Sequence, residues 1–243
     1  MSGDAQPELD PELQEWLAQA RELEDDASDA DLEGLLGDVE KQMEAADGRW
    51  TFWLESRPTW MRRAIAIAAA VAVVGVAGAM LVRPDIGEQP VAFMAVALGS
   101  MGALLSVSLF FALRPLHQPP LPGGVRAAVV GVTLASTCAL AFFAPHEVPE
   151  QSVGLLQHVS PCLFYGLLAG LPVYGLLRLL DRGGVTVALL GACAAGLTAD
   201  LTLQLHCPRN DLEHLMAAHF AVVLLFVGGL GVIHWLIERA RNR

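Results

Sequence analysis

The chain has 243 residues, of which 54% are hydrophobic and 17% charged, and its formal net charge is −11. This balance is more apolar than that of soluble domains, and it excludes a disordered chain, a disulfide-dense miniprotein and a nucleic-acid binder with a basic surface. Residues 1–60 hold 17 acidic and 4 basic side chains, a net charge of −13, whereas residues 61–243 have a net charge of +2. We therefore predict an acidic head, residues 1–60, and an apolar body, residues 61–243.

The head contains two stretches that predict short amphipathic helices. Asp10-Pro11-Glu12 has the N-cap, proline and first-turn acid of a helix start, and Ser28 marks a weaker second start. Two short helices bury little core without a partner, and their acidic faces favour a basic one. A solvated acidic tail is the alternative. The predicted partner-binding residues form the two apolar stripes: Leu13, Trp16, Leu17 and Leu23, then Leu32, Leu35, Leu36 and Val39.

The body predicts a six-helix transmembrane bundle, so the fold class is all-α with a short helical head. Each apolar stretch is about 20 residues long, the length that an α-helix needs to cross a bilayer. Gly166 and Gly170 form a GxxxG pattern, which allows close helix packing in lipid. Tryptophans such as Trp53 and Trp60, just before the first stretch, are typical of the membrane interface. The six predicted spans are 63–82, 91–113, 125–144, 154–177, 185–205 and 215–237.

The distribution of arginine predicts the orientation of the spans, because basic loops stay in the cytoplasm. If the head is cytoplasmic, only Arg83 and Arg209 fall on the outer side. An even number of spans then returns the C-terminus to the cytoplasm, in a bacterial inner membrane. The basic residues on the cytoplasmic side are Arg57, Arg62, Arg63, Arg114, Arg126, Arg178, Arg182, Arg239, Arg241 and Arg243.

Cysteine and histidine residues gather on the predicted outer side. Cys162 and Cys207 are candidates for a disulfide or a redox sensor, whereas Cys138 and Cys193 are expected to be core residues. Thiolate and imidazole are also the usual ligands of zinc and copper. As a third alternative, these cysteines and histidines have a structural role only and hold the ends of the helices together. The candidate metal ligands are His158, Cys162, His206, Cys207, His214 and His219.

Two further observations limit the function. Asp200 is the single acidic residue well inside a span, where pairing with His219 would explain it. So little intramembrane charge argues against a small transporter, which stays an alternative. The sequence shows no nucleophile–base–oxyanion set and no phosphate loop, so we expect no enzymatic activity and no cofactor other than zinc or copper at the Cys/His cluster.

Four short motifs resemble those of the NrsF-like bacterial membrane proteins, six-span negative regulators of sigma factors. The motifs are Arg57-Pro-Thr-Trp-Met-Arg-Arg63, Ser160-Pro-Cys162 followed by Gly166 and Pro172, Gly191 through Gly196, and Leu205-His-Cys-Pro208 followed by Asp211. The resemblance covers residues 56–237. It implies an anti-sigma factor whose cytoplasmic head, residues 1–60, holds a sigma factor of the extracytoplasmic-function type and releases it on a signal sensed by the spans. It implies no direct contact with nucleic acid. A membrane redox or metal-responsive protein is the alternative function.

Overall fold

The structure is a computed structural model that describes Gly34 and residues 53–54, 56–80, 82–115, 118–119, 121–146, 155–180 and 185–241. The predicted head helices therefore fall outside the described residues. The same holds for the partner-binding residues predicted there: Leu13, Trp16, Leu17, Leu23, Leu32, Leu35, Leu36 and Val39.

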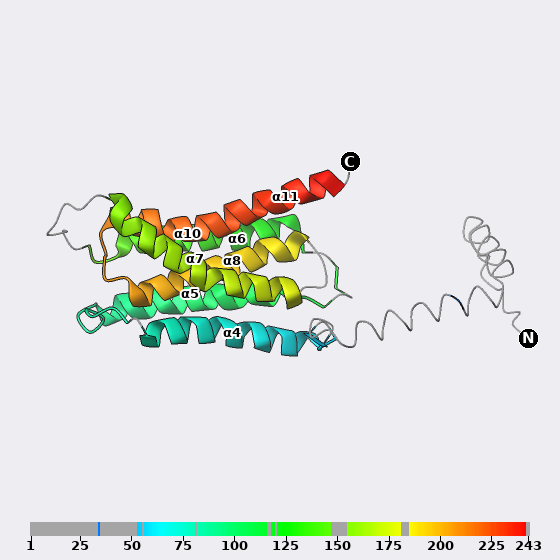
Figure 1. Cartoon of the computed structure of the whole chain (residues 1–243), viewed down its shortest axis with the longest axis horizontal. Coiled ribbons are helices and arrows are strands. Elements are labelled where there is room, and N and C mark those ends of the chain that lie inside the picture. Colours follow the sequence, from blue (N-terminus) through cyan, green and yellow to red (C-terminus); the bar gives the residue numbers. More distant parts are fainter. Residues whose placement is uncertain are drawn as a thin grey trace, which may run out of the picture. The chain divides into compact units, whose positions relative to one another are not determined.

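The body consists of helices, and six of them are long and apolar enough to cross a membrane (Figure 1). This confirms the predicted all-α bundle of a multi-pass membrane protein. The first five spans are α4 (Thr59–Met80), α5 (Val91–Ala112), α6 (Gly123–Phe143), α7 (Leu155–Leu180) and α8 (Val185–His206). The sixth span is built in pieces: α9 (Leu212–His214), the π-helical segment η1 (Leu215–Phe220), α10 (Ala221–Leu224), the second π-helical segment η2 (Leu225–Gly229) and α11 (Leu230–Arg241).

The centre of the bundle is α8, which contacts α4, α5, α6, α7 and the sixth span. Its residues from Leu190 to Gln204 are all buried. Glycine, alanine and threonine dominate this helix, and such small side chains let neighbouring backbones approach closely. The hydroxyls of Thr198 and Thr202 donate to the carbonyls of Ala194 and Thr198, at 2.8 and 2.9 Å, so they need no partner outside the helix. Of the six spans, α8 is the most deeply buried within the bundle and has the lowest mean hydropathy.

The glycine pattern predicted for close packing is confirmed. A Cβ added at Gly166 would lie 3.1 Å from side-chain atoms of Leu203 and Val222, and one at Gly170 would overlap Phe226. Cys193 on α8 is fully buried, as predicted for a core residue. Cys138 on α6 is half-buried.

The bundle has two chemically different ends. Eight arginines of the described chain lie at or near the end where α4 begins, called here the arginine end: Arg57, Arg62, Arg63, Arg114, Arg126, Arg178, Arg239 and Arg241. The opposite end is called the thiol end, and it contains the α4–α5 and α8–α9 loops with Arg83 and Arg209. The predicted orientation of the spans depends on this unequal distribution of arginine between the two ends. The cytoplasmic placement of both termini stays a prediction.

Arginines on α4 cap its neighbours at the arginine end. The Arg62 guanidinium donates to the Leu180 carbonyl at 2.6 Å, and Leu180 is the last residue of α7. Arg63 donates through Nε to the carbonyl of Leu113, at 3.0 Å, and its guanidinium lies 3.7 Å from the centre of the Phe110 ring. Because the last carbonyls of a helix have no partner within it, cations stabilise helix C-termini. The start of α4 is thereby held against the ends of α5 and α7.

Candidate functional site

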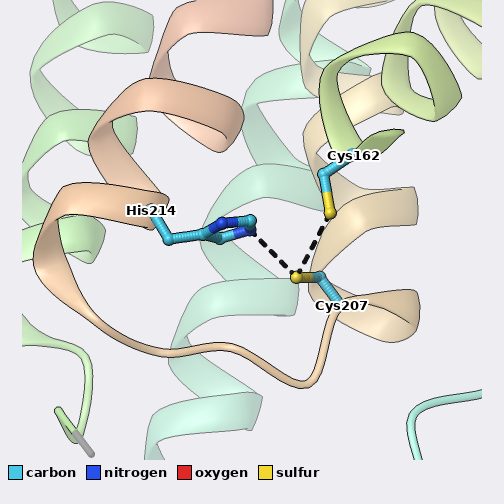
Figure 2. Close-up of side chains that lie close together, drawn as sticks. All are labelled: Cys162, Cys207 and His214. Carbon is cyan, nitrogen blue, oxygen red and sulfur yellow. Dashed lines mark hydrogen bonds between the residues drawn. The ribbon is translucent and has the colours of Figure 1, made fainter. Parts of the chain in front are cut away.

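The candidate site lies at the thiol end, where three separate parts of the chain bring cysteine and histidine together (Figure 2). Cys162 lies in the second turn of α7, Cys207 is the first residue after α8, and His214 ends α9. The side-chain ligand atoms of these three residues all lie within 4.8 Å of one another. The cluster is assembled by the tertiary fold, because 45 residues separate the two cysteines in the sequence.

The two thiols are in direct contact. Their sulfur atoms lie 3.6 Å apart and share a hydrogen bond, without a covalent bond between them. Cys207 is 2% exposed, whereas Cys162 is half-buried. The hydrogen bond with Cys162, and then burial, raise the pKa of the Cys207 thiol, although His214 and His219 act to lower it. Cys207 is therefore a buried thiol with a raised pKa, and its sulfur lies 3.1 Å from Nε2 of His214.

His214 is fixed by a helix cap. Asp211 is the N-cap of α9, and its carboxylate accepts a hydrogen bond from the His214 backbone N–H at 3.0 Å. Arg209 donates to the second carboxylate oxygen at 2.8 Å. Burial opposes ionisation of Asp211, but these hydrogen bonds outweigh it, and the pKa of Asp211 is lowered. The cap directs Nε2 of His214 to 3.1 Å from the Cys207 sulfur.

A second histidine extends the cluster into the membrane span. Nδ1 of His219 lies 3.0 Å from a carboxylate oxygen of Asp200, and both side chains are almost fully buried. This confirms the predicted pairing. The rings of His214 and His219 meet edge to face with centroids 5.9 Å apart. Nδ1 of His214 and Nε2 of His219 are buried and have no hydrogen-bond partner among the described residues.

The π-helical segment η1 explains why both histidines belong to one cluster. Residues five apart in an α-helix point in directions that differ by about 140°. A π-helix has a wider turn, closed by hydrogen bonds between residues five apart, and such segments are frequent at functional sites. Because η1 begins at Leu215, directly after His214, it rotates His219 back to the side of the helix that His214 occupies. Nothing in the local sequence indicates this change of turn.

The other predicted ligands lie elsewhere. The ring of His206 packs against Tyr165, with centroids 4.4 Å apart, and does not join the three-residue group. His158 lies on α7, one turn before Cys162, and its side chain is not among those that the structure describes. Of the six predicted metal ligands, the structure therefore brings Cys162, Cys207 and His214 within 4.8 Å of one another, and the ring of His219 lies beside that of His214.

A buried polar network beside the cluster was not predicted. Arg83 follows α4 and is 2% exposed; it donates to both carboxylate oxygens of Asp85, at 2.8 and 2.5 Å. Its guanidinium also donates to the carbonyl of Pro208, at 3.0 Å, and to the side chain of Asn210, at 3.2 Å. Gln89 completes the network, since its amide bonds Asp85 and accepts from Asn210. In the sequence, Arg83-Pro84-Asp85 only separates the first two apolar stretches, and nothing there indicates the distant partners of Arg83.

The Arg83 network predicts an acid-dependent loss of stability. The hydrogen bonds from Arg83 hold the pKa of the Asp85 carboxyl below its ordinary value. A lowered pKa stabilises the fold above the unfolded-state value of about 3.9, and this contribution disappears as the pH falls through the folded-state pKa. We expect Asp85→Asn to unfold at a lower temperature than the wild type at pH 7, with a difference that shrinks below about pH 4. Thermal unfolding in detergent at several pH values measures this; a difference independent of pH would contradict it.

Comparison with known proteins does not decide the family. A scan of the chain against protein-family models gives no match, and searches of curated proteins and of solved structures give none either. The functional argument therefore depends on the chemistry of the cluster, on its connection to α4 and on the sequence motifs.

Proposed function

We propose that this protein is a membrane-anchored anti-sigma factor of the inner membrane. Its acidic head holds a sigma factor of the extracytoplasmic-function type in the cytoplasm, and a signal received at the thiol end releases it. The activity is binding and release, without a catalytic step. The observation that carries the proposal is the cluster of Cys162, Cys207 and His214, because thiol and imidazole groups react or coordinate when the chemical environment changes. Both cysteines belong to the motifs that resemble the NrsF-like proteins.

The contacts of α4 supply a route from the cluster toward the head. The backbone N–H of Arg83, just after α4, donates to the carbonyl of Leu205 at 3.0 Å. Its side chain donates to the carbonyl of Pro208, on the other side of Cys207. A displacement of the Cys207 loop is therefore passed to the end of α4. At the arginine end, Arg62 and Arg63 tie the start of α4 to α5 and α7. A signal that favours a second arrangement of these contacts changes how the head is presented.

Co-purification tests the proposal. The full chain is expressed together with a sigma factor of the extracytoplasmic-function type from the same genome and isolated in detergent. We expect the sigma factor to co-purify with the wild type, and Trp16→Ala with Leu17→Ala to reduce its yield at least tenfold, because buried aromatic and aliphatic anchors dominate interfaces. Ala18→Ser, on the other side of the same predicted helix, is the matched control and should retain the partner. Failure of the wild-type chain to hold the sigma factor would refute the proposal.

A membrane redox protein is the second candidate, and the contact between the two thiols favours it. Oxidation of Cys162 and Cys207 to a disulfide would remove two protons and two electrons, and the sulfurs already lie 3.6 Å apart. Thiol trapping distinguishes this candidate: both cysteines would become resistant to alkylation under oxidising conditions, whereas Cys138 would not. The transporter alternative loses its motivating residue, because Asp200 is buried and hydrogen-bonded to His219.

A further inference from the structure

The cluster has a donor set and a spacing that fit a metal ion. Zinc binds thiolate at about 2.3 Å and imidazole at about 2.0–2.1 Å, almost always in a tetrahedron at structural sites. Two ligand atoms of such a tetrahedron lie roughly 3.3–3.8 Å apart. The Cys162 and Cys207 sulfurs are 3.6 Å apart, and Nε2 of His214 lies 3.1 Å from the Cys207 sulfur. Two of the three distances between ligand atoms are thus close to those around one ion, and all three atoms lie within 4.8 Å of one another.

The fourth donor comes from His219, whose ring lies beside that of His214 but whose ligand atom is not within 4.8 Å of all the others, so it must move toward the ion on binding. Its Nδ1 faces the Asp200 carboxylate at 3.0 Å; in the neutral ring that acceptor requires the proton on Nδ1, and Nε2 is then the nitrogen that can coordinate. This Nε2 is buried without a hydrogen-bond partner of good geometry, although the ring is close enough to the Cys207 thiol to lower its pKa. Hydrogen bonds of good geometry do not satisfy this buried atom. A metal ion beside Cys207 does, because the carboxylate–histidine–metal arrangement is the usual way to orient an imidazole ligand.

We propose that Cys162, Cys207, His214 and His219 bind one divalent cation, with Zn²⁺ as the best fit, and that Asp200 is a positioning residue that acts through His219. Two thiolates neutralise the charge of the ion, so the buried site carries no net charge. Four protein ligands leave no open coordination position, which is typical of a structural or sensory site. On binding, the two thiols lose their protons to solvent and no electron is transferred. The inference extends the proposed function by naming the ligand of the same site.

Metal binding to the purified full chain tests this inference. The protein is isolated in detergent under reducing conditions, stripped with a chelator and titrated with Zn²⁺ or Co²⁺. We expect one ion per chain by mass spectrometry, with the thiolate-to-cobalt charge-transfer band of a tetrahedral site. Cys162→Ser or His219→Gln should weaken Zn²⁺ binding at least tenfold, and Asp200→Asn should weaken it roughly 10- to 100-fold while the four ligands remain. Cys193→Ser and His146→Gln are the controls and should bind like the wild type.

A second measurement keeps the test valid if a variant fails to fold. In the wild type, Zn²⁺ should slow the alkylation of Cys162 and Cys207 but not that of Cys138. Substoichiometric metal in the wild type, or unchanged affinity in His219→Gln, would overturn the four-ligand site. Co-purification of the sigma factor is measured separately, so the metal site and the proposed function can each fail without the other.

Discussion

Replacing Arg83 by alanine is expected to lower the free energy of unfolding by about 3 kcal/mol, because removing one partner of a buried ion pair leaves the other uncompensated. The substitution deprives Asp85, Asn210 and the Pro208 carbonyl of their donor at once. We place the loss at the lower end for buried pairs because Asp85 is 21% exposed. Arg83→Lys keeps the charge but not the planar fork, so an intermediate loss is expected. Unfolding in mixed micelles, followed by circular dichroism, measures the change.

The matched control for Arg83 is Arg209, the other arginine of the thiol end. Its guanidinium also pairs with an aspartate two residues on, Asp211, but its side chain is 28% exposed. A partly exposed arginine gains less from its ion pair than a buried one, so Arg209→Ala should cost about 1 kcal/mol, less than Arg83→Ala. Equal losses in the two variants would show that burial of the Arg83 network contributes nothing to stability.

Adding a methyl group at Gly170 is expected to destabilise the bundle by about 2–3 kcal/mol, because overpacked helix contacts must move apart. A Cβ there would lie 2.8 Å from the backbone oxygen of Ala195 and 2.5 Å from a ring carbon of Phe226. The ring can rotate, but the backbone oxygen belongs to the central helix α8 and cannot. Gly170→Ala should therefore lower the unfolding midpoint and loosen the contact between α7 and α8.

Gly175, five residues further along α7, is the control for this substitution. Nothing lies within 4 Å of a Cβ added there. Alanine has a higher helix propensity than glycine by about 1 kcal/mol, so Gly175→Ala should leave stability unchanged or raise it slightly. If both variants lose the same stability, close packing at Gly170 is not what limits substitution.

The spans were predictable because their length and apolar composition are local properties. The predicted second span, residues 91–113, differs by one residue from α5, Val91–Ala112. α4 begins earlier than predicted, at Thr59, because Pro58 starts the helix and Arg62 and Arg63 bond neighbouring helix ends instead of lying in a loop. The central position of α8 was not predictable, since hydropathy does not tell which helix is surrounded by the others.

The site was predictable only in part. The sequence placed Cys162 and Cys207 on one side of the membrane, and the structure adds their contact. It could not separate His206 from His214, because the direction of each ring depends on the Asp211 cap and on the partner Tyr165. The Arg83 network escaped prediction for the same reason: its partners lie up to 127 residues away in the sequence.

The buried Asp200–His219 pair has a consequence for biosynthesis. An ionised aspartate at the centre of a span opposes membrane insertion by about 2.5–3.5 kcal/mol. When α8 leaves the ribosome, its partner His219 has not yet been made, because it belongs to the sixth and last span. The helices already inserted must hold α8 until the final span arrives. The Cys/His cluster is completed only when the chain has been translated through His219, so a product truncated before the sixth span lacks it.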